Sequence, residues 1–333
     1  SKPNGKFQYY IIREQADKVY DPNDMGFLLN NNYASNTLHL YYIEQKPRGI
    51  MVNTTTRLTS MYNTLFESSK FKYFGLEAAN KTTYSNYWIS HFVFTASPLG
   101  FRDYYEPRIW GSVYRKPAYY NLDAIVATDS RKPFYVRWQA TWLTMPENNS
   151  HGWELELTPR MRFSDRATLT LDVTYSKTYN DYGWVNTAFD SLMQPTIFFG
   201  KRNVATLNTM LAGRYTFSTR TSLTLRLRHY WSQVDYDRYY SLKHDGSLEN
   251  SDYQGDHDIN FNAFTADAQF VWYFAPGSEL SVVWKNAINS FDNRMISNYF
   301  DNLDRTFNTP QANSFSIRVL YYLDYQYIRK LMK

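Results

Sequence analysis

The sequence predicts a transmembrane antiparallel β-barrel of the outer-membrane type, and three observations lead to this prediction. Apolar and polar residues alternate along much of the 333-residue chain, which is typical of strands with one apolar and one polar face. Aromatic residues make up 19% of the chain. The mean hydropathy is −0.57, and no run approaches the roughly 18 apolar residues that a membrane helix needs. Together these features are typical of a barrel whose lipid-facing wall uses every second residue.

The alternation is clearest over residues 166–177, where odd positions are apolar and even positions are polar. A soluble β-sandwich, including the Tyr- and Trp-rich domains that act on carbohydrates, shows the same alternation. The content of the two faces favours the membrane barrel. The apolar faces are rich in aromatic residues, whereas the polar faces carry Arg, Glu and Asp in mid-strand. In a membrane barrel the aromatics contact lipid and the charges line a hydrated or ion-paired lumen.

The expected strands follow one another as hairpins along the chain. In the first part we expect strands over residues 7–13, 37–44, 50–62, 71–80 and 87–96. Residues 97–117 contain three Pro and two Gly among aromatics and charges, which predicts a surface loop. Beyond this loop we expect strands over residues 119–126, 134–142, 153–162, 166–177, 204–217, 222–236, 261–274, 279–287 and 313–325.

The connections between these strands have two kinds of length. Short turns at residues 164–165, 218–220 and 275–278 alternate with long connections around residues 182–195, 244–256 and 290–310. Membrane barrels have short periplasmic turns and long extracellular loops. We therefore predict one barrel domain over residues 1–333 with about 14 strands, and 16 if one or two opening strands precede it. The even count places both termini at the short-turn end.

The composition argues against several kinds of binding site and against nucleic acid as a partner. The chain has no cysteine, so it forms no disulfide and no thiolate metal site. Its net charge of +5 is spread in mixed-sign pairs, which gives no indication of nucleic-acid binding. The six histidines are scattered singly, without metal-ligand spacing. We expect no metal and no cofactor. The first residues are polar and carry no signal peptide, so we expect a mature chain or the ordered part of a longer one.

Several stretches of the chain look like turns and strands of a known family and not like an active site. They are residues 20–28 with Asn31 and Asn32, and residues 128–132, 199–202, 225–231, 274–278 and 320–325. These stretches resemble a family of large outer-membrane proteins of Bacteroidota whose function is unknown. In that family the barrel follows a periplasmic β-sandwich similar to carbohydrate-binding family 9. The resemblance implies a bacterial outer-membrane location and a chain that is the C-terminal part of a longer protein.

Charged residues at polar positions in mid-strand are the most distinctive candidate site. Clustered Arg in a lumen favours anions, sugars or carboxylates. Because the acids nearly match the bases in number, we favour the alternative of an ion-paired network that fills the lumen. The predicted lumen-lining cluster consists of Arg137, Glu154, Glu156, Arg160, Arg162, Asp172, Arg214, Arg226, Arg228, Asp267, Lys285 and Arg318, and Arg57, Glu77 and Asp123 have the same position in earlier strands.

Three other groups of residues have a functional and a structural interpretation. His229 shares the lipid-facing parity of Leu225, so an exterior Ser/His hydrolase is conceivable, but no nucleophile is evident and we favour an interfacial histidine. The acids of residues 245–258, and Asp21, Asn23 and Asp24 in the early loop, suit Ca²⁺, although a solvated loop fits better. Loop aromatics suit stacking on sugars, and they equally suit interfacial girdles and loop caps. They are Tyr104, Tyr105, Trp110, Tyr182 and Trp184.

We therefore expect a non-enzymatic structural or accessory component of an outer-membrane protein assembly. The alternative is a diffusion or uptake channel for small polar solutes such as saccharides, and a minor alternative is an outer-membrane hydrolase. The expected partners are outer-membrane lipid, lipopolysaccharide and other outer-membrane or periplasmic proteins, without nucleic acid. A channel requires an open lumen with segregated charges. A scaffold requires a lumen closed by ion pairs and inward loops such as residues 97–117.

Overall fold

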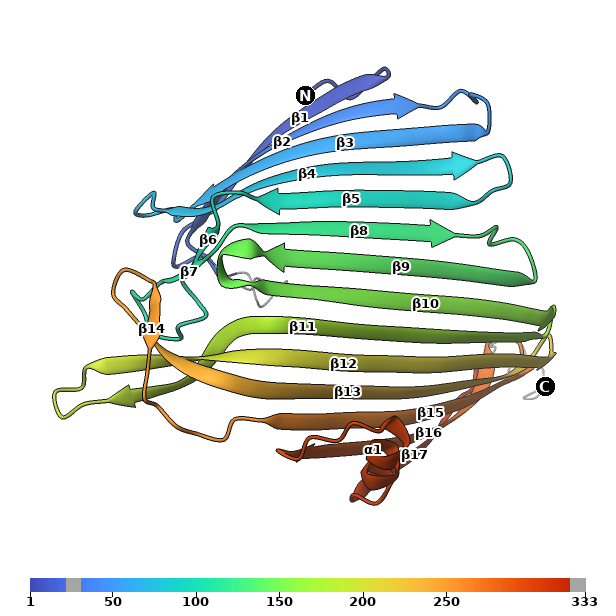
Figure 1. The fold of residues 1–333 in the computed structure, drawn as a ribbon. Coiled ribbons are helices and arrows are strands. Elements are labelled where there is room, and N and C mark those ends of the chain that lie inside the picture. The colour runs from blue at the N-terminus through green and yellow to red at the C-terminus, as the bar shows by residue number, and fades with distance from the viewer. Residues whose placement is uncertain (22–30, 324–333) are drawn as a thin grey trace.

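The chain folds into one large antiparallel sheet of 17 strands with one α-helix beside it (Figure 1). The computed structural model describes residues 1–21 and 31–323. Within these residues, no helix has the length and apolar character required to cross a membrane. The prediction of an all-β antiparallel fold is confirmed.

Fourteen of the strands form a meander in which each strand pairs with the next one along the chain. All fourteen strands expected from the sequence overlap one of them. The fourteen are β1 (Phe7–Ala16), β2 (Tyr33–Glu44), β3 (Met51–Thr64), β4 (Phe71–Tyr84), β5 (Ile89–Ser97), β8 (Tyr119–Ala127), β9 (Phe134–Met145), β10 (Ser150–Ser164), β11 (Ala167–Phe189), β12 (Pro195–Ser218), β13 (Thr221–Leu242), β15 (Ile259–Ala275), β16 (Ser278–Asp292) and β17 (Gln311–Leu320).

The remaining elements belong to the connections. The predicted loop over residues 97–117 contains two three-residue strands, β6 (Phe101–Asp103) and β7 (Tyr114–Lys116). A third short strand, β14 (Leu248–Asn250), pairs with β13, and the helix α1 (Tyr299–Phe307) connects β16 to β17. A 3₁₀ turn, η1 (Pro146–Asn148), joins β9 to β10. These three short strands account for the difference between the 17 observed strands and the predicted 14.

The two ends of the sheet differ as the turn lengths predict. At one end, the connections of residues 165–166, 219–220 and 276–277 have two residues each; we call this the short-turn end. The opposite end carries β6, β7, β14 and the connection that contains α1, and we call it the loop end (Figure 1). Both described ends of the chain belong to strands whose outer termini lie at the short-turn end.

One predicted connection is mostly strand. Residues 182–195 were expected to be a long loop, but β11 and β12 continue as a paired hairpin to residues 189 and 195. The stretch contains Gly183, Asn186, Asp190 and Ser191, which favour turns in isolation. Register shifts near Thr178 and Trp184 absorb the irregular residues, so the ladder continues past them. Consequently β11, β12 and β13 reach 23, 24 and 22 residues.

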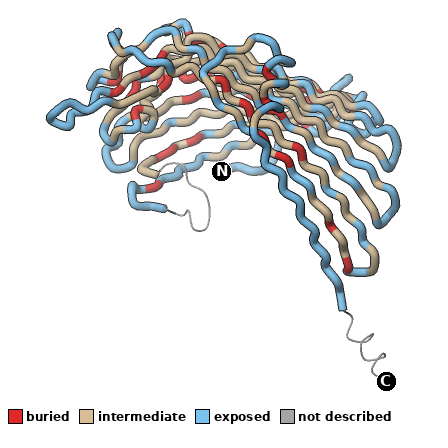
Figure 2. The backbone as a smooth tube through the Cα atoms, turned by 90° about the horizontal axis from the view of Figure 1, so that it is seen from below, coloured by how far each residue is buried: buried red, intermediate tan, exposed pale blue. Residues whose placement is uncertain are grey.

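The sheet is curved and open, whereas the sequence predicts a closed barrel. Figure 2 shows it as an arch. Among the described residues, β1 pairs with β2 alone and β17 pairs with β16 alone. All ten residues of β17 are exposed. A closed barrel needs a ladder from β1 to β17, directly or through further strands, and the described residues contain none.

Candidate functional site

The register gives the sheet one apolar and one charged face. Residues opposite each other on neighbouring strands project to the same side. One such row joins Leu58 through Ala78 to Phe94, Leu122 and Trp142. The alternate positions carry the charged residues. Helix α1 packs on the apolar face, which is the convex side, so the charged face is the concave one (Figures 1 and 2).

All the charges predicted to line the lumen lie on this charged face. Arg226, for example, is opposite Asp267, which is opposite Lys285. The same even or odd parity continues through the other strands. The set consists of Arg57, Glu77, Asp123, Arg137, Glu154, Glu156, Arg160, Arg162, Asp172, Arg214, Arg226, Arg228, Asp267, Lys285 and Arg318.

The charges form few ion pairs with one another. Within the described part of the chain, Arg57 pairs with Glu77 at 2.5 Å and Arg137 pairs with Glu156. No other member of the set forms an ion pair there. Asp172, on the strand next to Arg160, forms no ion pair with it; its carboxylate accepts a hydrogen bond from Thr158 at 2.8 Å. The continuous ion-paired network expected from the sequence is therefore absent from the described residues.

Bases predominate on one part of the charged face, and the rest of the face is mixed. On β12 to β17 the set has five bases, Arg214, Arg226, Arg228, Lys285 and Arg318, and one acid, Asp267. We call this the basic part of the face. On β8 to β11 the set has four acids, Asp123, Glu154, Glu156 and Asp172, and three bases, Arg137, Arg160 and Arg162. The basic part resembles one wall of the segregated lumen that the channel alternative requires.

Arg160 and Arg162 extend from β10 to the turn between β8 and β9. Arg160 donates a hydrogen bond to the carbonyl of Ser130, and Arg162 donates one to the carbonyl of Arg131 at 3.4 Å. Within the turn, Arg131 binds Asp129 through two nitrogens at 2.9 and 2.8 Å. This ion pair lowers the pKa of the Asp129 carboxyl to about 2. Two strand arginines thus hold the short-turn end together.

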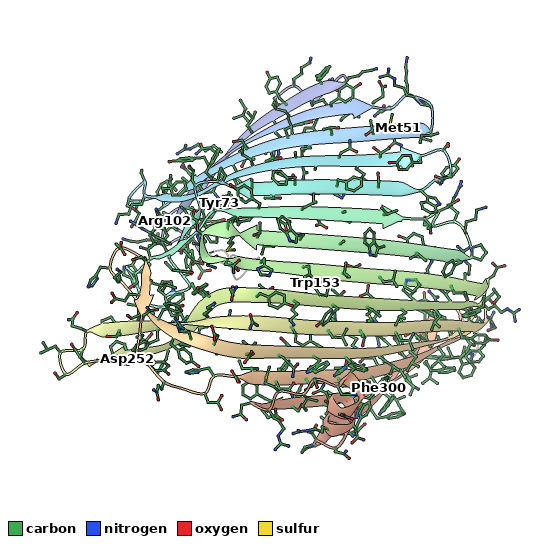
Figure 3. The ribbon with its side chains drawn as sticks, viewed as in Figure 1. Met51, Tyr73, Arg102, Trp153, Asp252 and Phe300 are labelled. Carbon is green, nitrogen blue, oxygen red and sulfur yellow. The ribbon has the colours of Figure 1, made fainter. Side chains whose placement is uncertain are left out.

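The loop end is packed more tightly than a set of mobile loops. The ring of Tyr114 of β7 packs at a tilt of 45° against that of Phe199 of β12, with ring centres 4.7 Å apart, and both are buried together with Ile197. Arg108 lies over the Trp184 ring at 3.8 Å. The loop after β5 is therefore fixed to the long β11–β12 hairpin. Figure 3 shows Arg102 and Asp252 at this same end of the sheet.

The five loop aromatics have different positions. Trp184 is part of the packed loop end, and the Tyr182 ring lies against Tyr240 with centres 5.5 Å apart. Tyr104 donates a hydrogen bond to the Phe71 carbonyl, and Tyr105 donates one to the Asn31 carbonyl. Trp110 is 86% exposed.

Below the helix α1 the apolar face carries a buried polar patch. His229 is 2% exposed, and its ring nitrogens contact the Tyr299 hydroxyl and the Asn262 side chain, both at 3.2 Å. Asn302 of α1 donates a hydrogen bond to Asn262 at 2.5 Å. His229 is thus covered by a helix and does not lie free at a membrane interface. Asn260 and Asn262 interrupt the apolar parity of β15, and this interruption is the signal in the sequence that could have indicated a covering element.

The comparison with protein families gives one match. A family model described as Domain of unknown function (DUF5916) matches residues 1–332. The chain belongs to this family. No curated protein and no solved structure matches the chain. The resemblance to an uncharacterised family is confirmed, while the bacterial group, the outer-membrane location and the preceding β-sandwich stay predictions.

The remaining candidate groups of the DUF5916 chain form no assembled centre. In residues 1–21 and 31–323, no cluster of three His, Asp or Glu side chains has the arrangement of a metal site. Asn23 and Asp24 of the early acidic loop lie outside the described residues. His39 contacts the Thr59 hydroxyl at 3.0 Å, and His257 contacts the Tyr253 hydroxyl at 2.8 Å. At His229, the described neighbours supply a phenol and an amide but no serine nucleophile.

Proposed function

We propose that this chain forms the wall of a transmembrane β-barrel in the bacterial outer membrane, and that the charged face lines a passage for small polar solutes. The observation that carries the proposal is a sheet with an exposed apolar face opposite a charged one. Trp138, Trp142 and Leu155 are 42%, 49% and 46% exposed. Continuous exposed apolar surfaces of this kind mark contacts with membrane or protein.

The strand lengths also support a membrane location. A tilted strand needs about 9–11 residues to cross the hydrocarbon layer. The shortest meander strands, β5 and β8, have nine residues each. The apolar face would contact lipid and lipopolysaccharide, and the charged face would remain hydrated.

Closure of the barrel is part of the proposal. A strand edge exposed to lipid leaves backbone groups without partners, which is costly in a membrane. The first and last meander strands, β1 and β17, run in opposite directions and have ten residues each. Ile11 and Ile317, 73% and 63% exposed, project from the apolar face of the two edges. Direct pairing would close 14 strands, and two intervening strands would give 16.

The charge distribution favours a passage over a filled scaffold. The fifteen charges of the predicted set comprise nine bases and six acids, and Arg57–Glu77 and Arg137–Glu156 are the ion pairs that join members of this set in the described residues. The excess of unpaired bases on β12 to β17 favours anions and polar solutes with acidic or hydroxyl groups.

A structural or accessory component of an outer-membrane assembly is the second candidate. The specific observation in its favour is the pair of open strand edges, β1 and β17, because an exposed edge can accept a strand from another protein. In that case strands of the partner, and not the pairing of β1 with β17, would complete the wall.

Single-channel recording in a planar bilayer tests the passage. We expect the full-length protein to show steady openings that prefer anions at asymmetric salt. The double variant Arg226→Glu/Arg228→Glu should shift the preference towards cations, because it makes the net charge of β13 on the charged face more negative by four elementary charges. The control is Arg294→Glu, a single Arg-to-Glu substitution in the connection after β16, outside the strands, and its shift is compared with that of Arg228→Glu alone.

A folded protein that carries no current would contradict the passage and favour the accessory component. Equal shifts in selectivity for Arg228→Glu and the Arg294→Glu control would contradict a role for the strand arginines. Far-ultraviolet circular dichroism of each variant establishes that the β-sheet is retained.

A further inference from the structure

The loop end contains a groove that the proposed passage does not use. Its volume is about 580 Å³, within the range of about 300–1,000 Å³ for small-molecule pockets. It lies where the connection with β6 and β7 meets β14 and the long parts of β11 and β13 (Figure 1). Side chains on its lining include Arg102, Tyr114, Glu147, Tyr182 and Tyr240.

The walls of the groove are fixed by backbone contacts between loops. The Arg115 amide donates a hydrogen bond to the Gly246 carbonyl at 2.8 Å, which joins β7 to the connection before β14. Gly100 has φ +61°, and a Cβ there would lie 2.3 Å from the Lys116 carbonyl oxygen. Only glycine fits this approach without a shift of the backbone. Because the walls are already joined, a ligand would not have to order them.

Two tyrosine rings form the aromatic side of the groove. The rings of Tyr182 and Tyr240 are tilted by 57° at a centre distance of 5.5 Å. Burial and, to a smaller extent, the neighbouring Tyr240 raise the pKa of Tyr182 to about 12. The phenol therefore stays protonated at neutral pH and can donate as well as accept hydrogen bonds. A ring face with a hydroxyl at its edge matches a sugar, which also combines C–H faces with hydroxyl groups.

The charges around the groove largely cancel. Lys116 pairs with Asp103 at 3.3 Å, and Arg115 lies 3.9 Å from Asp245. Within the described ranges, the side chains of Arg102 and Glu147 have no hydrogen-bonding or ionic partner. One base and one acid thus remain available to a ligand, so the groove has no strong net field for an anion.

We infer that this groove binds a short neutral oligosaccharide. The rings of Tyr182 and Tyr240 contact the sugar faces, and the free side chains of Arg102 and Glu147 bind sugar hydroxyls as donor and acceptor. This site goes beyond the proposed passage, since it is built from loop-end residues and does not require an open lumen.

Isothermal titration calorimetry of the full chain, in a detergent without a sugar headgroup, tests the inference. The probes are maltotriose, cellotriose, laminaritriose and xylotriose, with trigalacturonate as the anionic comparison. We expect saturable binding of at least one neutral trisaccharide. Tyr240→Ala should weaken it about tenfold through loss of the ring contact, and Tyr182→Phe should weaken it about three- to tenfold through loss of the hydroxyl.

Trp110→Ala is the control. Trp110 is an exposed aromatic residue of the connection between β6 and β7, which lies at the loop end, but it does not line the groove. Absence of binding by all four neutral probes would overturn the inference. Binding of trigalacturonate alone would identify an anion site instead and would also overturn it. Should Tyr240→Ala fail to fold, Tyr182→Phe and Arg102→Gln provide the test. Sugar binding by a chain that conducts no ions would reject the passage and support the groove.

Discussion

Asp129 and Arg131 show how single residues fix the short-turn end. Besides its two contacts with Asp129, the guanidinium of Arg131 lies 3.3 Å from the centre of the Tyr87 ring, in the neighbouring turn between β4 and β5. The carboxylate also accepts a hydrogen bond from the Arg131 amide at 3.0 Å. One acid and one base therefore stabilise a turn and connect it to the next hairpin.

The ion pair predicts a pH dependence of stability. Because the pKa of Asp129 falls from its usual 3.8 to about 2 on folding, its stabilisation is present above the unfolded pKa and is lost as pH falls through about 2. We expect Asp129→Asn to lower the denaturant midpoint of the refolded chain at pH 7, with a difference that narrows between about pH 4 and pH 2. Asp165→Asn, in another short turn, is the control. A difference that is constant across this range would contradict the ion pair.

At the scale of elements, α1 is held by buried polar groups together with ring contacts of Tyr299 on Trp231 and Phe307 on Phe264. Asn302 exchanges hydrogen bonds with Asn262, and Thr306 is buried beside it. The Asn298 side chain caps the helix by accepting from the amides of Phe300 and Asp301. The helix thus depends on amide side chains that β15 presents on its apolar face.

Removal of Asn302 should release this helix from the sheet. Asn302→Ala removes the acceptor to which the buried Nδ2 groups of Asn260 and Asn262 donate at 3.4 and 3.1 Å, which costs about 1–3 kcal/mol. We expect faster hydrogen exchange of the backbone amides of residues 299–307, with the strands unaffected. Asp304→Asn alters an exposed position of the same helix and should leave the exchange unchanged. Equal exchange in the Asn302→Ala variant and the native chain would show that other contacts hold α1.

The elements also show what sequence can and cannot predict. The alternation identified all fourteen meander strands and the shared face of the charges, because side-chain direction in a strand depends on parity alone. The length of β11 and β12 was missed because strand pairing overrides the turn preference of residues such as Gly183 and Asn186. Helix α1 was missed because its inner face is Asn302 and Thr306. The hydrogen bond from Thr158 to Asp172 depends on side-chain reach, and the groove depends on contacts between segments that are distant in the sequence, so alternation predicts neither.

At the scale of the whole molecule, the open edges make a testable statement about closure. We expect a cysteine placed at Ile11 or Tyr9 of β1 to form a disulfide with a cysteine at Phe315, Ile317 or Val319 of β17 in membrane-inserted protein, because all five positions project from the apolar face. Mild oxidation followed by gel electrophoresis detects the bond. Each single-cysteine variant is the control for links between chains. Absence of a link in every pair would contradict direct closure and favour intervening strands.

The β11–β12 hairpin is longer than a membrane is thick. At about 3.3 Å per residue, the 24 residues of β12 measure roughly 80 Å. A hydrocarbon layer of about 30 Å accounts for little more than half of that length even when the strand is tilted by about 45°. Membrane barrels place their long loops at the extracellular side; in that orientation the tip of this hairpin would rise above the lipid headgroups as a stiff projection. Phages and antibodies that approach an intact cell would meet this projection first.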